Sequence, residues 1–238
     1  MELKVIVPTA LSEITLDQYQ RFARLEGDEE FLTHKMLEIF CGVPLASLPN
    51  VRIKDVSHIS KHIMAMINEK PSLTPTFTMG DTKYGFIPEL DNITYGEFVD
   101  LDGYLQDVQD LHKAMAVLYR PITNEVKHRY LIEPYEGAGR YAEQMKQAPM
   151  SVAMGASLFF WRLGNELLRA SLTSLEKDNL KTNTPSKDNS QYVGDGTLQY
   201  INLLKEILEG LEESLNWNSK SVFISSHSKS KSKKLKTT

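Results

Sequence analysis

Two histidines of this 238-residue chain have a spacing that could bind a metal ion. His58 and His62 lie four positions apart, which places both imidazoles on one face of a helix. The sequence shows no third ligand at a matching spacing, because Cys41 lies in a different segment. We therefore interpret the two histidines as surface residues of a helix and expect no metal site.

Two acidic clusters and two glycine-rich stretches are candidates for cation and phosphate binding. The acidic residues at 26–30 and 100–110 do not follow the EF-hand loop, with its central Gly and final Glu, so we interpret them as solvated faces. The close glycines at 136–139 and 194–196 follow neither the dinucleotide-binding pattern nor the phosphate-loop pattern. We expect these glycines to lie in loops and expect no cofactor.

The sequence also lacks a recognisable nucleophile. Cys41 follows the apolar pair Ile39–Phe40, where a small buried residue is the usual role of a cysteine. A catalytic cysteine needs an adjacent base, and the sequence shows none. The chain contains no GxSxG and no HExxH motif. These patterns favour a protein that is not an enzyme and leave an enzyme with an unrecognised site as a remote alternative.

Arg120 is a cation within an apolar segment, AMAVLYRPI, and it precedes Pro121. A cation at the end of a helix stabilises the negative end of the helix dipole. Arg120 could equally pair with an acid such as Glu97 or Asp100. Glu97 itself stands three residues after Thr94, which is the capping-box pattern. We interpret Arg120 as a structural residue.

Composition and charge limit the classes of partner. Hydrophobic residues make up 41% of the chain and charged residues 24%, as in ordinary globular proteins, and no apolar run is long enough for a membrane helix. The formal net charge is -4, although six lysines and no acid lie between Ser219 and Thr238. The acidic remainder makes nucleic acid an unlikely partner, except for weak contact through the Lys-rich tail.

The spacing of apolar residues predicts the elements that would position these groups. Alternating residues on both sides of Gly80–Asp81 predict a β-hairpin, and HRYLIEPY is expected to pair with it as a strand. We expect an α+β fold, predominantly α-helical, with a small antiparallel sheet around Thr74–Pro88 and Arg129–Tyr135. Helices are expected over residues 16–26, 29–41, 55–68, 105–119, 137–147 and 149–177, with a further short helix after Thr94.

Composition also divides the chain into four parts. Residues 1–177 are expected to form the helical body with the small sheet. Residues 178–196 have almost no apolar content and form a polar linker. Apolar residues at helical spacing predict an amphipathic helix over 197–217. Residues 218–238 are a Ser/Lys-rich flexible tail.

Several segments occur in an order that resembles a known group of proteins. They are FLTHKMLEIFCGVP, YGFIPELDNITYGEFVDLDGY, HKAMAVLYRPI, YLIEPYEG and SLFFWRLGNELL. Together they resemble small virion and tail-assembly proteins of tailed bacteriophages, notably crAss-like phages, over about residues 11–168. The resemblance implies a role in the virion or its assembly, with no catalytic signature.

Proteins of this group serve either as tail assembly chaperones or as parts of the ring-like portal–tail assembly, and our hypothesis is a non-enzymatic structural protein of the portal–tail (head–tail) assembly. Such a protein would act in an oligomeric ring, with other copies of itself and other phage portal or tail proteins as partners. It would lie in the virion, and in the host cytoplasm during assembly. The alternative is a tail assembly chaperone that is absent from the mature virion. The residues expected to serve folding and assembly are Phe86, Tyr95, Glu97, Phe98, Tyr119, Arg120, Phe160 and Trp161.

Overall fold

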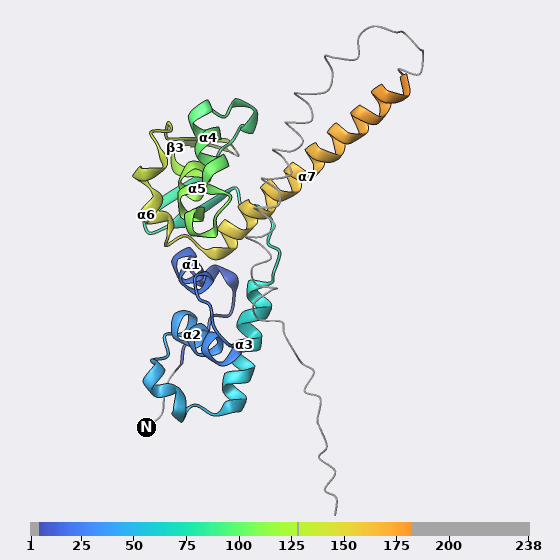
Figure 1. The fold of residues 1–238 in the computed structure, drawn as a ribbon. Helices are drawn as coiled ribbons and strands as arrows, with labels where there is room; N and C mark the ends of the chain where they lie inside the picture. Colours follow the sequence, from blue (N-terminus) through green and yellow to red (C-terminus); the bar gives the residue numbers. More distant parts are fainter. Residues whose placement is uncertain (1–4, 128, 182–238) are drawn as a thin grey trace, which may run out of the picture.

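Helices and one small antiparallel sheet form this protein, which confirms the expected α+β fold class. The computed structural model describes residues 5–127 and 129–181 (Figure 1). The α-helices of this part are α1 (Leu16–Ala23), α2 (Glu29–Cys41), α3 (Ile53–Ile67), α4 (Tyr95–Tyr104), α5 (Leu111–Leu118), α6 (Ala142–Met145) and α7 (Met150–Lys181). Short 3₁₀ helices cover Leu11–Glu13, Leu45–Asn50, Leu90–Asn92, Val108–Asp110 and Ala138–Arg140.

The first three helices pack together at one end of the molecule (Figure 1). Thr15 and Gln18 form a reciprocal capping box at the start of α1, as the sequence predicts. α2 begins where the Asp28 side chain accepts a hydrogen bond from the Phe31 amide. It ends at Gly42, whose φ of 65° suits a residue without a Cβ.

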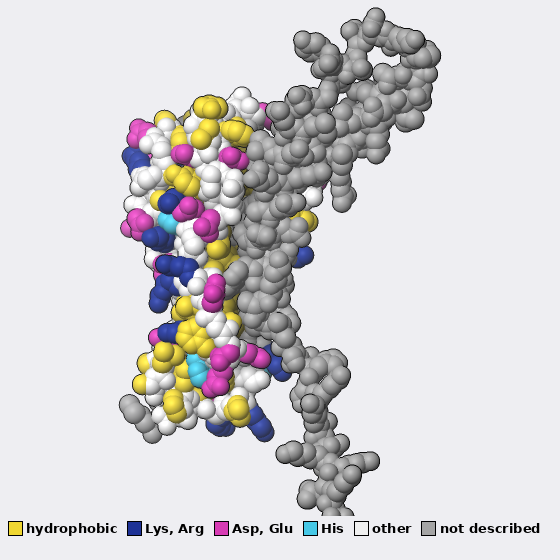
Figure 2. Space-filling model, viewed as in Figure 1, with side chains coloured by type: hydrophobic (Ala, Val, Ile, Leu, Met, Phe, Trp, Pro, Cys, Tyr) yellow, Lys and Arg dark blue, Asp and Glu magenta, His cyan; other side chains and the backbone are white. Residues whose placement is uncertain are grey.

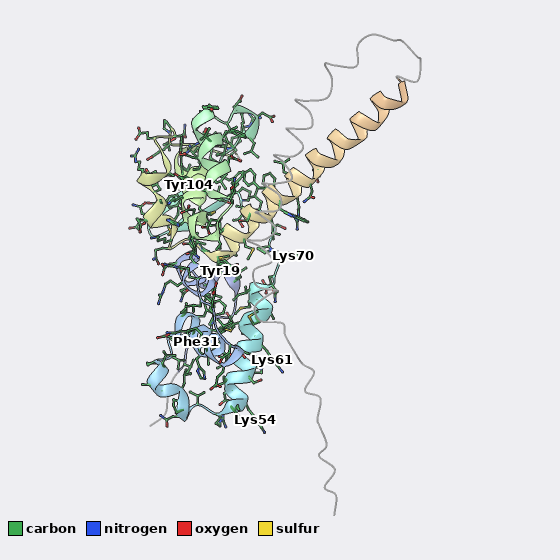
Figure 3. All side chains as sticks on the ribbon, in the orientation of Figure 1. Tyr19, Phe31, Lys54, Lys61, Lys70 and Tyr104 are labelled. Atoms are coloured by element: carbon green, nitrogen blue, oxygen red, sulfur yellow. The ribbon has the colours of Figure 1, made fainter. Side chains whose placement is uncertain are left out.

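α3 follows α2 as an amphipathic helix. Ile63 and Ile67 on its inner face are buried. Figure 3 shows Lys54 and Lys61 on its outer side, away from α2. α3 therefore packs its apolar face against α2 and exposes its own charged face to solvent.

The sheet has the strand order β1-β2-β3-β4, with every pair antiparallel. The tight turn at Gly80, whose φ is 57°, joins the first two strands as expected. β3 was not expected, because the sequence pattern assigned its first residue to a helix over 105–119 and treated Pro121 as the end of that helix. The strands are β1 (Thr76–Met79), β2 (Thr82–Phe86), β3 (Tyr119–Val126) and β4 (Arg129–Ile132).

Pro121 explains the beginning of β3. A residue that precedes proline is restricted to extended conformations, so Arg120 continues as a strand once α5 has ended at Leu118. Proline cannot donate to the ladder, but its carbonyl accepts a hydrogen bond from the Glu133 amide at 3.0 Å. A register shift between Ile122 and Asn124 follows directly.

The predicted helix over 105–119 is therefore split and shortened. α4 ends at Tyr104, a 3₁₀ turn covers Val108–Asp110, and α5 is eight residues long. The capping box of Thr94 and Glu97 starts α4, as expected. Every residue of α5 except Lys113 is buried, so this short helix is the centre of the core around which the sheet, α4 and α6 pack.

α7 begins after Pro149 and continues to Lys181, four residues beyond the expected end of the body at 177. Its first two turns are buried, and a Cβ at Gly155 would lie 2.5 Å from the carbonyl oxygen of Ser72. Its second half extends beyond the body (Figure 1). The predicted linker, the helix over 197–217 and the Lys-rich tail lie outside the described residues.

Backbone hydrogen bonds join the two ends of the body at α1. Leu16 and Asp17 donate to the carbonyls of Ala148 and Lys146, and Met150 donates to Ile14. None of the helices in the described part of the chain combines the length and apolar character that a bilayer crossing requires.

Candidate functional site

A groove of about 1000 Å³ lies beside β4. Its walls come from three places in the sequence. One wall is the segment from Ile87 to Asn92, the second is the start of α4 at Thr94 and Glu97, and the third is the run Arg129–Tyr135. Arg120 of β3 also reaches it. We call this hollow the β4 groove.

A buried ion pair lies at the inner end of the β4 groove. The Arg120 guanidinium donates from one terminal nitrogen to Glu97 Oε1 at 2.5 Å. Arg120 is 6% exposed and Glu97 is 4% exposed, so both charges are held almost completely out of water. The structure thus selects Glu97, rather than Asp100, as the partner of Arg120.

The capping box of α4 fixes this carboxylate. Glu97 Oε2 accepts hydrogen bonds from the Thr94 amide and the Thr94 hydroxyl, both at 2.7 Å. Burial raises the pKa of Glu97, but the hydrogen bonds from Thr94 and Arg120 outweigh it, so the pKa lies below its usual value. Glu97 therefore stays ionised and accepts bonds on both oxygens.

One buried hydrogen-bond donor of Arg120, Nε, has no acceptor among the described residues. The guanidinium carbon lies 5.5 Å from the centre of the Tyr135 ring, within reach of a cation–π contact. Tyr135 is held in turn by its hydroxyl, which donates to Asp100. The groove floor is thus a polar network with limited capacity for a further hydrogen bond.

β4 presents its open edge to the groove. All four residues of β4 and the three that follow it line the hollow, whereas one face of a strand would contribute only alternate residues. β4 pairs with β3 on its other side and has no strand partner at this edge among the described residues. Leu131 is 62% exposed here. Such an edge offers backbone donors and acceptors to another extended chain.

A smaller groove of about 520 Å³ continues the first one. The two share Ile87–Glu89, Asn92 and Tyr130. The smaller groove extends toward α7, where Phe159 forms part of its wall. The two hollows are therefore adjacent, and we call them together the channel beside β4.

Tyr130 lines both hollows and packs closely against the sheet. Its ring lies over Gly85, where a Cβ would be 2.5 Å from Tyr130 Cε2. Its hydroxyl donates to the Phe86 carbonyl at 2.9 Å. Gly85 is therefore required by this close approach rather than by its own backbone angles.

Three of the expected assembly residues lie in one aromatic cluster. The ring centres of Phe86 and Tyr119 are 5.3 Å apart, and those of Phe86 and Phe160 are 6.2 Å apart. Phe86 and Tyr119 are buried, while Phe160 and Trp161 are partly buried against the core. This cluster attaches α7 to the sheet, which is a folding role.

Two other expected residues, Tyr95 and Phe98, lie on the surface. They are 83% and 51% exposed, and the neighbouring Val99 is 47% exposed. Spacings of three and four residues place all three on one face of α4. Figure 2 shows hydrophobic side chains gathered at the end of the molecule formed by α4. We call these three residues the α4 apolar face.

The remaining candidates are the histidines of α3 and Cys41. His62 lies with Nε2 3.2 Å from the carbonyl oxygen of Pro8, and no group of metal-ligating side chains forms in the described part of the chain. Cys41 is buried, and burial raises the pKa of its thiol to about 11. This environment suppresses the thiolate.

Sequence reasoning singled out Glu97 and Arg120 of the β4 groove but missed the rest of its walls. Arg129, Tyr130 and Leu131 were expected only as part of a strand, without a site. Their role depends on β3, which lies between β2 and β4 and was not predicted. The β-branched residues after Pro121 were the available signal for that strand.

Comparison with known proteins identifies no relative. No family model matches the chain, and neither a curated protein nor a solved structure is significantly similar to it.

Proposed function

We propose that this chain is a non-enzymatic structural protein that works through protein–protein contacts in the portal–tail assembly of a tailed bacteriophage. The observation that carries the contact-making role is the α4 apolar face. The phage assignment rests on the ordered sequence segments between residues 11 and 168 that resemble virion and tail-assembly proteins. In this proposal the protein lies in the virion and forms an oligomeric ring.

The α4 apolar face suits a contact with a second copy of the chain. An aromatic side chain that is 83% exposed contributes little to the stability of a lone subunit. Tyr and Phe are also enriched in the centres of protein interfaces. A ring requires that this face meet a different surface of the next copy, because a contact of one patch with itself gives a dimer.

Light scattering over a concentration series tests the contact. We expect a discrete oligomer for the natural chain and a smaller species for Tyr95→Ser combined with Phe98→Ser. Ile53→Ser is the matched control, because Ile53 is also 83% exposed but lies on α3. A monomer at every concentration, or an oligomer unaffected by the double substitution, would contradict the role of the α4 apolar face.

Mass spectrometry of purified virions tests the location. Presence at a fixed stoichiometry supports the structural role. Absence from the virion, together with abundance in infected cells, would contradict it and favour the tail assembly chaperone.

A further inference from the structure

The outer edge of β4 has two residues whose backbone groups point away from the sheet. The Glu133 amide donates to the Pro121 carbonyl of β3, and the Leu131 carbonyl accepts a side-chain hydrogen bond from β3, so both residues direct backbone groups toward β3. Backbone groups alternate in direction along an antiparallel ladder. The N–H and C=O groups of Tyr130 and Ile132 therefore point outward, where no strand of the described part of the chain pairs with them.

The side chains along this edge form a pattern that is complementary to itself. Arg129, Leu131 and Glu133 occupy alternate positions, so all three belong to one face of the strand. Leu131 is 62% exposed, and the cation and the carboxylate lie two residues before it and two residues after it. When two such strands run antiparallel with Leu131 opposite its own copy, each Arg129 faces a Glu133.

The ion pairs already present within one chain leave this match available. Arg129 is exposed and has no carboxylate within ion-pair distance over the described ranges. Glu133 accepts a hydrogen bond from the Tyr141 hydroxyl and lies 3.6 Å from a terminal nitrogen of Arg140. Arg140 lies closer, at 2.8 Å, to Glu136, and the second arginine of the β4 groove is neutralised in the buried pair. A carboxylate can accept about four hydrogen bonds, so Glu133, whose side chain is 26% exposed, can also accept from a cation of another chain.

A second copy of the chain is the occupant that this pattern favours. Any extended polypeptide can use the backbone groups of an open edge, but the flanking charges select a strand that carries an acid and a base at the same spacing. β4 of another copy has this spacing and is already ordered by its pairing with β3. An ordered strand loses little conformational entropy when it binds.

We propose that two copies of this chain pair antiparallel through the outer edges of β4, with the two-fold axis at Leu131. Tyr130 of each copy lies opposite Ile132 of the other, and each of these pairs exchanges both of its N–H···O bonds. Leu131 lies opposite Leu131 of the second copy in a non-hydrogen-bonded pair, where cross-strand side chains are closest. The two four-stranded sheets join into one continuous sheet.

This contact is separate from the α4 apolar face and does not depend on the proposed phage role. It joins one patch to the same patch of a second copy, whereas a ring contact joins two different surfaces. Both tests below use the full chain with Tyr95→Ser and Phe98→Ser. In this background the β4 contact is measured without the α4 apolar face, so failure of one contact is distinguishable from failure of the other.

Disulfide trapping tests the register of the two strands. Leu131→Cys places two cysteines opposite each other across the two-fold axis, and Cys41 does not compete because it is buried. Val126→Cys is the matched control, because Val126 is also 62% exposed but lies on β3. We expect Leu131→Cys to form covalent dimers about tenfold faster than Val126→Cys. Equal rates, or no covalent dimer from either variant, would overturn the proposal.

Charge reversal provides a second measurement without introduced cysteines. Arg129→Glu and Glu133→Lys each place like charges opposite each other, and we expect either one to weaken the dimer about tenfold in analytical ultracentrifugation. A mixture of the two variant proteins restores opposite charges at both positions and should form a mixed dimer about as stable as the unreversed one. Arg140→Gln is the control for the lost internal contact of Glu133 and should leave the dimer unchanged. A mixture that associates no better than its separate components would contradict pairing through β4.

Discussion

Arg120 and Glu97 show how burial changes the role of a charged pair. Both side chains are nearly inaccessible to water, and the carboxylate accepts bonds from Thr94 as well as from Arg120. Taking two charges out of water costs much of what their attraction returns. The pair therefore contributes less to net stability than to fixing the start of α4 against β3.

Loss of one partner has a large effect. We expect Glu97→Ala to lower the free energy of unfolding by about 3–5 kcal/mol, because the Arg120 charge would remain buried without a counter-ion. Urea unfolding followed by circular dichroism measures it. The double variant Glu97→Leu with Arg120→Met should recover much of the loss. A cost below about 1 kcal/mol for Glu97→Ala would show that water replaces the carboxylate.

His112 couples stability to pH. It is 7% exposed, and its Nδ1 lies 3.1 Å from Gln20 Nε2 of α1. Burial, and then the charge of Lys146, lowers the pKa of His112 below its usual value. The unfolded chain therefore binds a proton more readily, so stability falls as the pH drops below about 6.5 toward the lower pKa of the folded state.

This pH effect is measurable by thermal unfolding at pH 7.5 and at pH 5.5. We expect a lower Tm at pH 5.5, and a smaller decrease in His112→Gln, which cannot be protonated in this range. An equal decrease in both proteins would assign the pH dependence to other groups.

At the scale of elements, α7 depends on a close approach to the segment before β1. The absence of a side chain at Gly155 lets the helix lie against the Ser72 carbonyl. Glycine normally destabilises the interior of a helix. At position 155 this cost is accepted because only glycine allows the close contact with the Ser72 backbone. One turn further along the same helix, Phe159 and Phe160 contact Phe86 of β2.

Two glycine-to-alanine substitutions distinguish the effect of the close contact at Gly155 from the effect of helix propensity. We expect Gly155→Ala to cost about 1–3 kcal/mol, because the new Cβ would displace backbone rather than a flexible side chain. Gly103→Ala in α4 meets no atom within 4 Å and should be neutral or stabilising by up to about 1 kcal/mol. Chemical denaturation of both variants gives the comparison, and equal effects would contradict the close packing.

At the scale of the whole molecule, α1 contacts elements at both ends of the body. It packs on α2, and its first residues donate to the backbone just before α7. Gln20 of α1 also donates to the carbonyls of Val108 and Gln109. These hydrogen bonds therefore connect the two ends of the body.

This shared helix predicts one cooperative unfolding transition. Ile63→Ala in α3 removes a fully buried side chain and should cost about 2–5 kcal/mol. We expect amides of β2 and β3 to lose protection by the same free energy as those of α3, as measured by native-state hydrogen exchange. Unchanged protection in the sheet would show that the two ends unfold independently.

The sequence by itself determined the helices with clear caps and the first hairpin. Thr15, Asp28 and Thr94 act on neighbouring amides within a few residues, so their effects are visible in local spacing. Gly80 likewise fixes its turn through its own backbone angle. The α+β class follows from such local signals alone.

Only the tertiary structure decided β3, the choice of Glu97 as the partner of Arg120, and the channel beside β4. Pro121 and the β-branched residues after it favour an extended conformation, but residues 119–126 form a strand of the sheet because β2 and β4 pair with them on both sides. The separation of exposed Tyr95 from buried Tyr119 has the same origin. Burial and pairing depend on contacts between distant segments, and those contacts exist only when the chain has folded.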